Sequence, residues 1–269
     1  MKRTIPILLY HHVAPDREIT SEALERQLRY LLDQGYESVA MDDVLAHVEG
    51  RLSLDKRAFA VTFDDGYADN WFCAFPVLRK LGVKATMYLV TEKVETQDSL
   101  RTICARVDTR SAERAAGGFL SWAEASAMAA SGLVTIGSHT HTHRNFVRRA
   151  PYENISVELA QSKRLIEEHL GRPCDHLAWP WGDFEKSWWP EVRAAGYRTA
   201  VTTRSGANTQ GTHPFFLKRL NMSRASLPWF ESRLRWNRHA LVAAAVGPLY
   251  GIDRRLKSWI QSESPYSHG

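Results

Sequence analysis

Short apolar segments alternate with longer amphipathic segments over the first 220 residues of the chain. The run 7–10 predicts a strand, and 21–34 carries leucines at helical spacing before Gly35, which predicts a helix that ends there. The same patterns predict further strands at 36–40, 58–63, 85–90, 134–138, 176–179, 198–202 and 216–220. They predict helices from Asp42, at 71–81 with Pro76 as an irregularity, from the capping box Ser121-Trp122-Ala123-Glu124 to Gly132, over 155–170 and over 185–195. Strands that alternate with helices favour a parallel α/β sheet, although periodicity does not distinguish an open sheet from a barrel.

Two adjacent carboxylates, Asp64 and Asp65, follow the apolar strand 58–63 and precede Gly66. An apolar run of this kind is typical of a parallel strand buried on both faces, and active sites of α/β folds lie at the carboxyl ends of such strands. Successive side chains of a strand point to opposite faces, so the two acids act alike only if the chain turns, which Gly66 permits. The alternative is an Asp-Gly turn whose acids only cap a loop.

Three histidines follow another predicted strand, 134–138, within five residues: His139, His141 and His143. A lone histidine is more often a core or surface residue. Imidazole is a common metal ligand, and two histidines with one carboxylate leave open positions on a zinc-like ion for water and substrate. The density of histidines therefore favours a metal site.

Together, Thr62-Phe63-Asp64-Asp65-Gly66 and His139-Thr140-His141-Thr142-His143 resemble the first two motifs of the polysaccharide deacetylases, carbohydrate esterase family 4 with a NodB homology domain. The resemblance implies that Asp64 is the catalytic base. It implies that Asp65, His139 and His143 bind a divalent ion, most readily Zn²⁺, with Co²⁺, Ni²⁺ or Mn²⁺ as alternatives, and that His141 is a neighbour. It also implies a distorted (β/α)7 barrel, and it covers residues 5–222.

The third motif of that family is altered in this chain. Leu177-Ala178-Trp179-Pro180-Trp181-Gly182 is similar to it, but Ala178 stands where the family has an arginine that orients the catalytic Asp. Arg219 is the candidate replacement and is grouped with Pro180 and Trp181 as substrate-binding; the alternative is a solvated basic strand end. The resemblance places Trp181 in the substrate groove with its backbone N–H available to the oxyanion. The alternative for both Trp179 and Trp181 is a core or rim aromatic without a role in binding.

The family's late Leu-x-His motif, which supplies a general acid, is missing. Tyr10-His11-His12-Val13 resembles the start of the exopolysaccharide-type members, in which the first histidine lies by the metal. His11 is accordingly the candidate general acid, and His12 is expected to be structural or exposed.

The resemblance implies that residues 1–222 form the barrel, and residues 223–269 are expected to form a helical extension. The chain has 269 residues, 44% of them hydrophobic, which is enough for one large core. From Lys218 to the end there are nine Lys or Arg and three acids, +6 against +5 for the whole chain. Phe230, Leu234 and Leu241 share one face of this tail. It is expected to pack on the barrel, the alternative being peripheral contact with an anionic membrane surface.

Cellular location is predicted from the cysteines and the N-terminus. Cys73, Cys104 and Cys174 are scattered and odd in number, as in reduced proteins. The apolar run 5–10 is too short for a signal peptide, and no run approaches a membrane span. These features predict a cytoplasmic protein or one at the inner membrane face. Nucleic acid is not expected as a partner, because the basic tail lacks binding motifs.

The resulting hypothesis is a metal-dependent N-deacetylase that hydrolyses the acetamide of an N-acetylated sugar to an amine and acetate. One alternative is an amidohydrolase acting on a non-sugar amide. Another is an inactive carbohydrate-binding relative, which would not need to keep Asp65, His139 and His143 together. The polar segment 92–118 is expected to be an insertion near the rim of the site.

Overall fold

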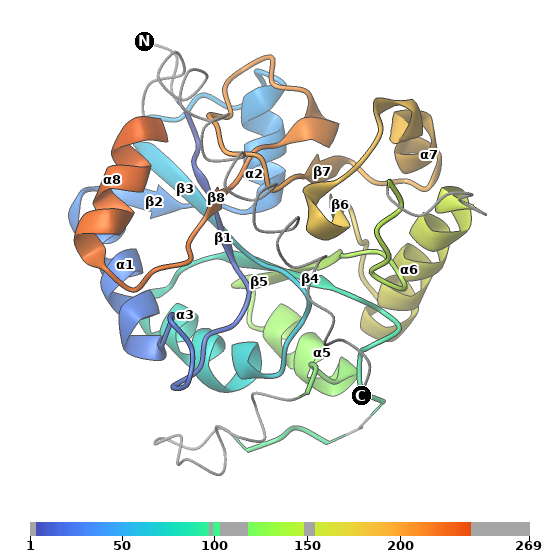
Figure 1. Cartoon of the computed structure of the whole chain (residues 1–269), viewed down its shortest axis with the longest axis horizontal. Coiled ribbons are helices and arrows are strands. Elements are labelled where there is room, and N and C mark those ends of the chain that lie inside the picture. Colours follow the sequence, from blue (N-terminus) through green and yellow to red (C-terminus); the bar gives the residue numbers. More distant parts are fainter. Residues whose placement is uncertain (1–3, 97–98, 103–117, 148–153, 238–269) are drawn as a thin grey trace, which may run out of the picture.

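Seven parallel strands form a distorted barrel in the computed structural model, which describes residues 4–96, 99–102, 118–147 and 154–237 (Figure 1). Their order is β7 (Thr199–Val201), β6 (His176–Ala178), β5 (Val134–Ser138), β4 (Ala85–Leu89), β3 (Arg57–Phe63), β1 (Ile7–Tyr10) and β8 (Leu220–Asn221). The sheet closes because Leu217 bridges Val201 of β7, while Leu220 pairs with Leu8 of β1. A further strand, β2 (Tyr36–Ser38), pairs with the first half of β3 outside this ring. The predicted (β/α)7 barrel is confirmed.

Helices follow most strands and surround the sheet (Figure 1). They are α1 (Ser21–Asp33), α2 (Met41–Val48), α3 (Phe75–Leu81), α5 (Trp122–Ala130), α6 (Ile155–Leu170), α7 (Trp189–Ala194) and α8 (Leu227–Asn237). The predicted capping box is present, since Ser121 and Glu124 exchange side-chain and backbone bonds at the start of α5. Pro76 lies in the first turn of α3, directly after the π-helical turn Asn70–Ala74, so the predicted helix 71–81 continues through it.

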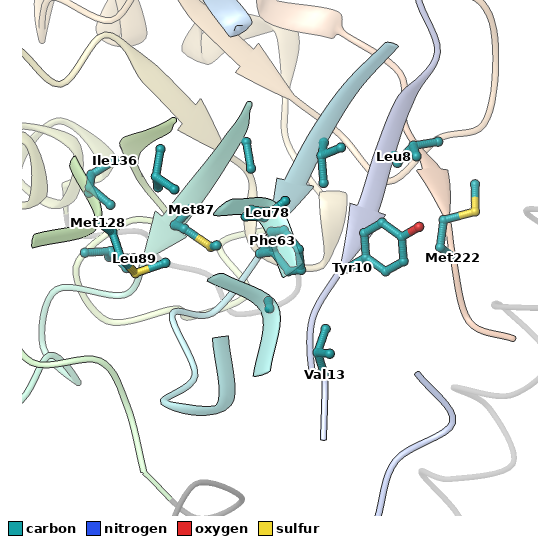
Figure 2. Packing of buried hydrophobic residues seen from close by; sticks show 14 of the residues in the cluster. Leu8, Tyr10, Val13, Phe63, Leu78, Met87, Leu89, Met128, Ile136 and Met222 are labelled. Atoms are coloured by element: carbon teal, nitrogen blue, oxygen red, sulfur yellow. The ribbon is translucent and has the colours of Figure 1, made fainter. Parts of the chain in front are cut away.

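The two faces of the strands pack into two separate hydrophobic clusters, as the period of two requires. Leu8, Val61, Met87 and Ile136 belong to the cluster that includes the surrounding helices. Figure 2 shows part of it along β1, β3 and β4. The alternate positions, among them Ile7, Ala60 and Tyr88, belong to the cluster inside the barrel, which α2 covers at one end through Met41 and Val44. All residues of β3 after Arg57 are buried, as predicted.

The predicted strand 216–220 is wrong in its bounds. A 3-10 turn occupies Pro214–Phe216, and β8 contains only Leu220 and Asn221. The reason is that the segment crosses from β7 to β1 within a few residues, so each neighbouring strand pairs with only part of it.

Helix α8 packs against α1. Phe230 and Leu234 are buried, and the Phe230 ring meets Tyr30 of α1 edge-on at 6.2 Å. Leu241 and the rest of the tail lie outside the described residues. Cys73 and Cys174 are buried free thiols, while Cys104 also lies outside the described part. No helix among the described residues is long and apolar enough to cross a bilayer.

An ion pair ties together the chain on either side of residues 103–117. The Arg101 guanidinium donates to both carboxylate oxygens of Glu124 at 2.6 Å and also to the Phe119 carbonyl oxygen. Glu124 is completely buried. Within the expected insertion 92–118, Arg101 and the final residues before α5 therefore lie side by side, while 97–98 and 103–117 lie outside the described residues.

Replacing Arg101 by methionine is expected to lower the free energy of unfolding by about 3–5 kcal/mol, because the buried Glu124 carboxylate would lose its cation. Urea unfolding would measure this. Arg164→Met is the matched control: Arg164 pairs with Glu168 on the surface of α6, with both side chains more than half exposed, and its loss should cost about 1 kcal/mol or less. Equal effects of the two substitutions would contradict the prediction.

Candidate metal centre and active site

Three of the predicted site residues extend inward-facing rows of the barrel strands. In β3, Ala60 faces the barrel interior, so Asp64 continues its row beyond Thr62. By the same alternation, His11 lies in the inward-facing row of β1 that contains Ile7. His139 likewise lies in the inward-facing row of β5 that contains Gly137. The alternation therefore directs three chemically active side chains to one end of the barrel, where the strands have their carboxyl ends.

Asp64 is held by the buried side chain of Arg219, which directly precedes β8. The Arg219 guanidinium donates to both Asp64 oxygens at 2.6 Å, and its Nε–H donates to the Thr202 carbonyl oxygen. Burial raises the pKa of Asp64, but the guanidinium and the neighbouring imidazoles outweigh burial, and the net pKa is lowered. Asp64 is thus an ionised carboxylate in a buried site.

Arg219 itself has no exposed surface. The alternative of a solvated basic strand end is therefore wrong. The assignment of Arg219 as a substrate-binding residue is also corrected, because a completely buried guanidinium reaches substrate only through Asp64.

Asp65 leaves the strand direction, as the sequence required of one of the two acids. Its φ is 71°, in the left-handed region, and Gly66 follows with φ 72°. A Cβ on Gly66 would lie 2.8 Å from Leu89 Cδ2, so a side chain there would be both strained and crowded. The turn brings Asp65 Oδ1 to 3.4 Å from His139 Nε2 and to 3.2 Å from His143 Nε2.

The donor set of Asp65, His139 and His143 fits a divalent transition metal. Among the described residues these three form the group whose ligand atoms converge, all within 4.8 Å of one another. His139 Nδ1 bonds the Ala178 carbonyl oxygen at 2.8 Å, which leaves Nε2 as the ligand atom. One carboxylate and two imidazoles are a common catalytic zinc set that leaves a coordination position for water or substrate. His141 lies outside this group, as predicted.

His11 and His12 have different environments. Burial lowers the pKa of His11, against the opposing effect of the Asp64 and Asp65 carboxylates. His12 instead bonds the buried Asp69 carboxylate at 2.6 Å through Nδ1, and its ring stacks on Tyr67. The expectation that His12 is structural or exposed is met by this pairing.

Backbone strain is concentrated at the site. Among the described residues, Asp65, Thr140, His143, Asn154 and Trp181 are the non-glycine residues with positive φ. All but Asn154 belong to the motifs singled out in the sequence. Left-handed backbone at such residues costs about 1–3 kcal/mol each and is typical of functional sites, where the surrounding structure holds it in place.

The two tryptophans of the altered third motif have opposite environments. Trp179 is completely buried and stacks near Phe184, so it is a core residue. Trp181 is 60% exposed, and its ring centroid lies 5.5 Å from that of His143. Pro180 is buried, which leaves Trp181 as the exposed ring of this turn beside the site.

Replacing Gly182 by alanine is expected to lower the free energy of unfolding by more than about 1 kcal/mol and to displace Trp181. Its φ is 73°, and a Cβ would lie 2.0 Å from Thr203 Oγ1 and 2.6 Å from the Thr203 nitrogen. Gly35→Ala is the matched control, because Gly35 has a similar φ of 74° but no atom within 4 Å of the added carbon. Comparing the two by urea unfolding separates the clash from the backbone strain, and a smaller loss at Gly182 than at Gly35 would contradict the prediction.

Sequence reasoning missed the residues that support the ligands from other elements. Glu158 of α6 and Thr91 after β4 form hydrogen bonds with the loop that carries the histidines. Ala178 was singled out only for the arginine it replaces, whereas its carbonyl oxygen accepts a hydrogen bond from the His139 ring. Nothing in the local pattern marks Glu158 or Thr91, because each is an ordinary helix or loop residue when viewed along the chain.

Comparison with known proteins agrees with this geometry. A family model described as polysaccharide deacetylase matches residues 51–200, more than half of the chain. The chain belongs to the polysaccharide deacetylase family. As a member it is a hydrolase of the class that acts on carbon–nitrogen bonds other than peptide bonds. The match includes both Asp64-Asp65 and the three histidines.

Three relatives illustrate how little sequence identity this chain shares with similar proteins. It is 25% identical over 221 residues to the putative polysaccharide deacetylase YxkH of Bacillus subtilis, covering 81% of this chain and 71% of that protein. It is 22% identical over 214 residues to the poly-beta-1,6-N-acetyl-D-glucosamine N-deacetylase of Escherichia coli K12, covering 70% of this chain but only 31% of the relative. The solved structure of IcaB from Ammonifex degensii superposes with a TM-score of 0.71 at 24% identity, covering 88% of this chain and 98% of that one. This likeness supports the fold.

Proposed function

We propose that the protein is a metal-dependent N-deacetylase that hydrolyses the acetamide of an N-acetylated saccharide to a free amine and acetate. The observation that carries the proposal is the pairing at one barrel end of two differently held acids. Asp64 is fixed by Arg219, and Asp65 faces two imidazoles. Two carboxylates in unlike environments are suited to two different tasks.

The residues have distinct roles in this proposal. Asp65, His139 and His143 hold the ion, which supplies Lewis-acid polarisation of the acetamide carbonyl and lowers the pKa of a water molecule. Asp64 accepts the proton of the attacking water, and Arg219 keeps the Asp64 carboxylate ionised and oriented for that transfer. The C–N bond of the tetrahedral adduct then breaks as His11, in its protonated form, donates its proton to the leaving nitrogen; Asp64 returns the proton of the water to solvent, and His11 takes up a proton before the next turnover. Trp181 offers an exposed ring beside the site.

Saccharide is favoured over a non-sugar amide by the relatives, whose printed names describe deacetylases of polysaccharides and of poly-beta-1,6-N-acetyl-D-glucosamine. An inactive binding relative is disfavoured, because Asp65, His139 and His143 are not only present but converge. Zn²⁺ is the proposed ion because it accepts this mixed imidazole and carboxylate set.

The test is acetate release from N-acetylglucosamine oligomers by the purified protein, before and after treatment with a chelator and after addition of Zn²⁺. The proposal expects release that the chelator abolishes and zinc restores. Bound metal without acetate release would move the proposal to a different amide substrate. A protein that binds no divalent ion would contradict the proposed mechanism.

A further inference from the structure

The loop between β5 and α6, residues 139–143, is held by a carboxylate that the proposed chemistry does not use. Glu158, in the first turn of α6, accepts hydrogen bonds from the backbone N–H of His141 at 2.8 Å and of Thr142 at 3.1 Å. It also accepts the Thr142 hydroxyl at 2.5 Å. We infer that Glu158 is a positioning residue of the metal centre, which holds this loop so that His143 faces Asp65. The inference rests on the proposed function, since it concerns the same metal site.

The middle histidine ties the same loop to the same helix. His141 Nδ1 lies 2.9 Å from Thr91 Oγ1, and His141 Nε2 lies 3.0 Å from Gln161 Nε2. Gln161 follows Glu158 by three residues and therefore lies on the same face of α6. The histidines of the motif thus have two roles. His139 and His143 face Asp65, whereas His141 connects the segment after β4 to α6 through hydrogen bonds.

The backbone of this loop is strained, and two of its N–H groups are satisfied from outside the loop. Thr140 and His143 both have positive φ, 66° and 58°. Two consecutive N–H groups, those of His141 and Thr142, donate to the same oxygen, Glu158 Oε2. A carboxylate satisfies both with charge-assisted bonds, which are stronger than neutral ones. Partners of this kind, which orient metal ligands without touching the metal, commonly contribute 10–100-fold to metal affinity.

The effect of Glu158 is expected on one ligand only. His139 directly follows β5, and the Ala178 carbonyl oxygen fixes its ring, while Asp65 is fixed by the turn at Gly66. His143 lies at the far end of the loop, where its own N–H reaches only Thr140 Oγ1, at 3.3 Å. Loss of Glu158 should therefore loosen His143 and leave the other two ligands in place.

A purely structural role is the competing explanation, since an acid in the first turn of a helix also stabilises the helix dipole. That role predicts the same loss of thermal stability with and without metal and no change in metal affinity. A positioning role predicts weaker metal binding and an altered coordination geometry. The two explanations are separated by measuring the metal rather than the activity.

The experiment compares Glu158→Gln with wild type by zinc competition against a chromophoric chelator and by the visible absorption spectrum of the cobalt-substituted protein. We expect zinc affinity to fall about 10–100-fold and the cobalt spectrum to change. Glu167→Gln is the matched control: Glu167 lies on the same helix and accepts the Cys174 N–H and the Lys163 ammonium, away from the loop. It should bind zinc as wild type does.

Thr142→Val keeps the side-chain shape and removes only the hydroxyl donor to Glu158, so it should weaken zinc binding less than Glu158→Gln does. If Glu158→Gln does not fold, the zinc affinity of Thr142→Val tests the positioning role instead. Wild-type zinc affinity in Glu158→Gln, or in Thr142→Val when that variant decides, would overturn the inference while leaving the proposed function intact. Absence of zinc binding by the wild-type protein would instead overturn the proposed function itself.

Discussion

Replacing Asp64 by asparagine is expected to lower the rate of acetate release by about 10²–10⁴-fold, the usual contribution of a general base. Asparagine has nearly the same shape as aspartate but cannot accept the proton of the attacking water. Asp65, His139 and His143 are unchanged, so the divalent ion should stay bound. The rate is measured on N-acetylglucosamine oligomers, and the metal content is measured on the same samples.

The control for this prediction is Asp65→Asn, which alters the other acid of the pair. It should lose both metal and activity, because Asp65 is the carboxylate that faces His139 and His143. Asp64→Asn should also unfold at lower urea concentration than wild type, since the buried Arg219 guanidinium keeps its charge without a carboxylate partner. Unimpaired acetate release by Asp64→Asn would exclude Asp64 as the base.

Removing the arginine of the same pair should lower the free energy of unfolding strongly. Arg219→Met leaves Asp64, which is 1% exposed, without its cation. We expect the free energy of unfolding of the metal-free protein to fall by about 3–5 kcal/mol at pH 7. Chelated protein is used so that the ion does not substitute for the missing guanidinium.

The loss should depend on pH with a defined sign. Arg219 lowers the pKa of Asp64 in the folded protein, so the ion pair contributes stability above the unfolded carboxyl pKa of about 3.9. That contribution disappears as the pH falls through the folded pKa. The stability difference between wild type and Arg219→Met should therefore shrink as the pH is lowered from 7. A difference that grows toward acidic pH would contradict this account.

The pH dependence of activity offers a second test of how Arg219 controls the ionisation of Asp64. Without the guanidinium, burial raises the pKa of Asp64, so the acidic limb of the kcat/KM profile should move to higher pH in Arg219→Met. Arg219→Lys keeps a positive charge but not the two-pronged contact, and its limb should lie between those of the other two proteins. An unshifted limb in Arg219→Met would mean that Arg219 does not control the ionisation of Asp64.

The elements of the barrel could be predicted from local pattern because they depend on local chemistry. The apolar runs of β1, β3 and β5, the capping box at Ser121 and the glycine after α6 are each encoded within a few neighbouring residues. The short strand β8 could not be predicted in the same way. Its extent depends on how far the segment 217–221 lies beside β7 before it reaches β1.

The candidate site also contains some features that local sequence predicts and others that it does not. The sequence by itself determined the chemical inventory: two adjacent acids after one buried strand, and histidines two residues apart after another. Strand alternation also determined that one of the two acids leaves the strand direction, and Gly66 permits the turn this requires. These are properties of neighbouring residues, which share a backbone geometry whatever the rest of the chain does.

Only the tertiary structure decided which distant groups complete that inventory. Arg219 lies 155 residues from Asp64 along the chain, and its local pattern is equally compatible with a solvated strand end. Glu158 resembles any acid in the first turn of a helix until the loop before α6 is seen to converge on it. Both carry charge whose effect depends on burial and on one partner, and these depend on how the barrel closes rather than on local sequence.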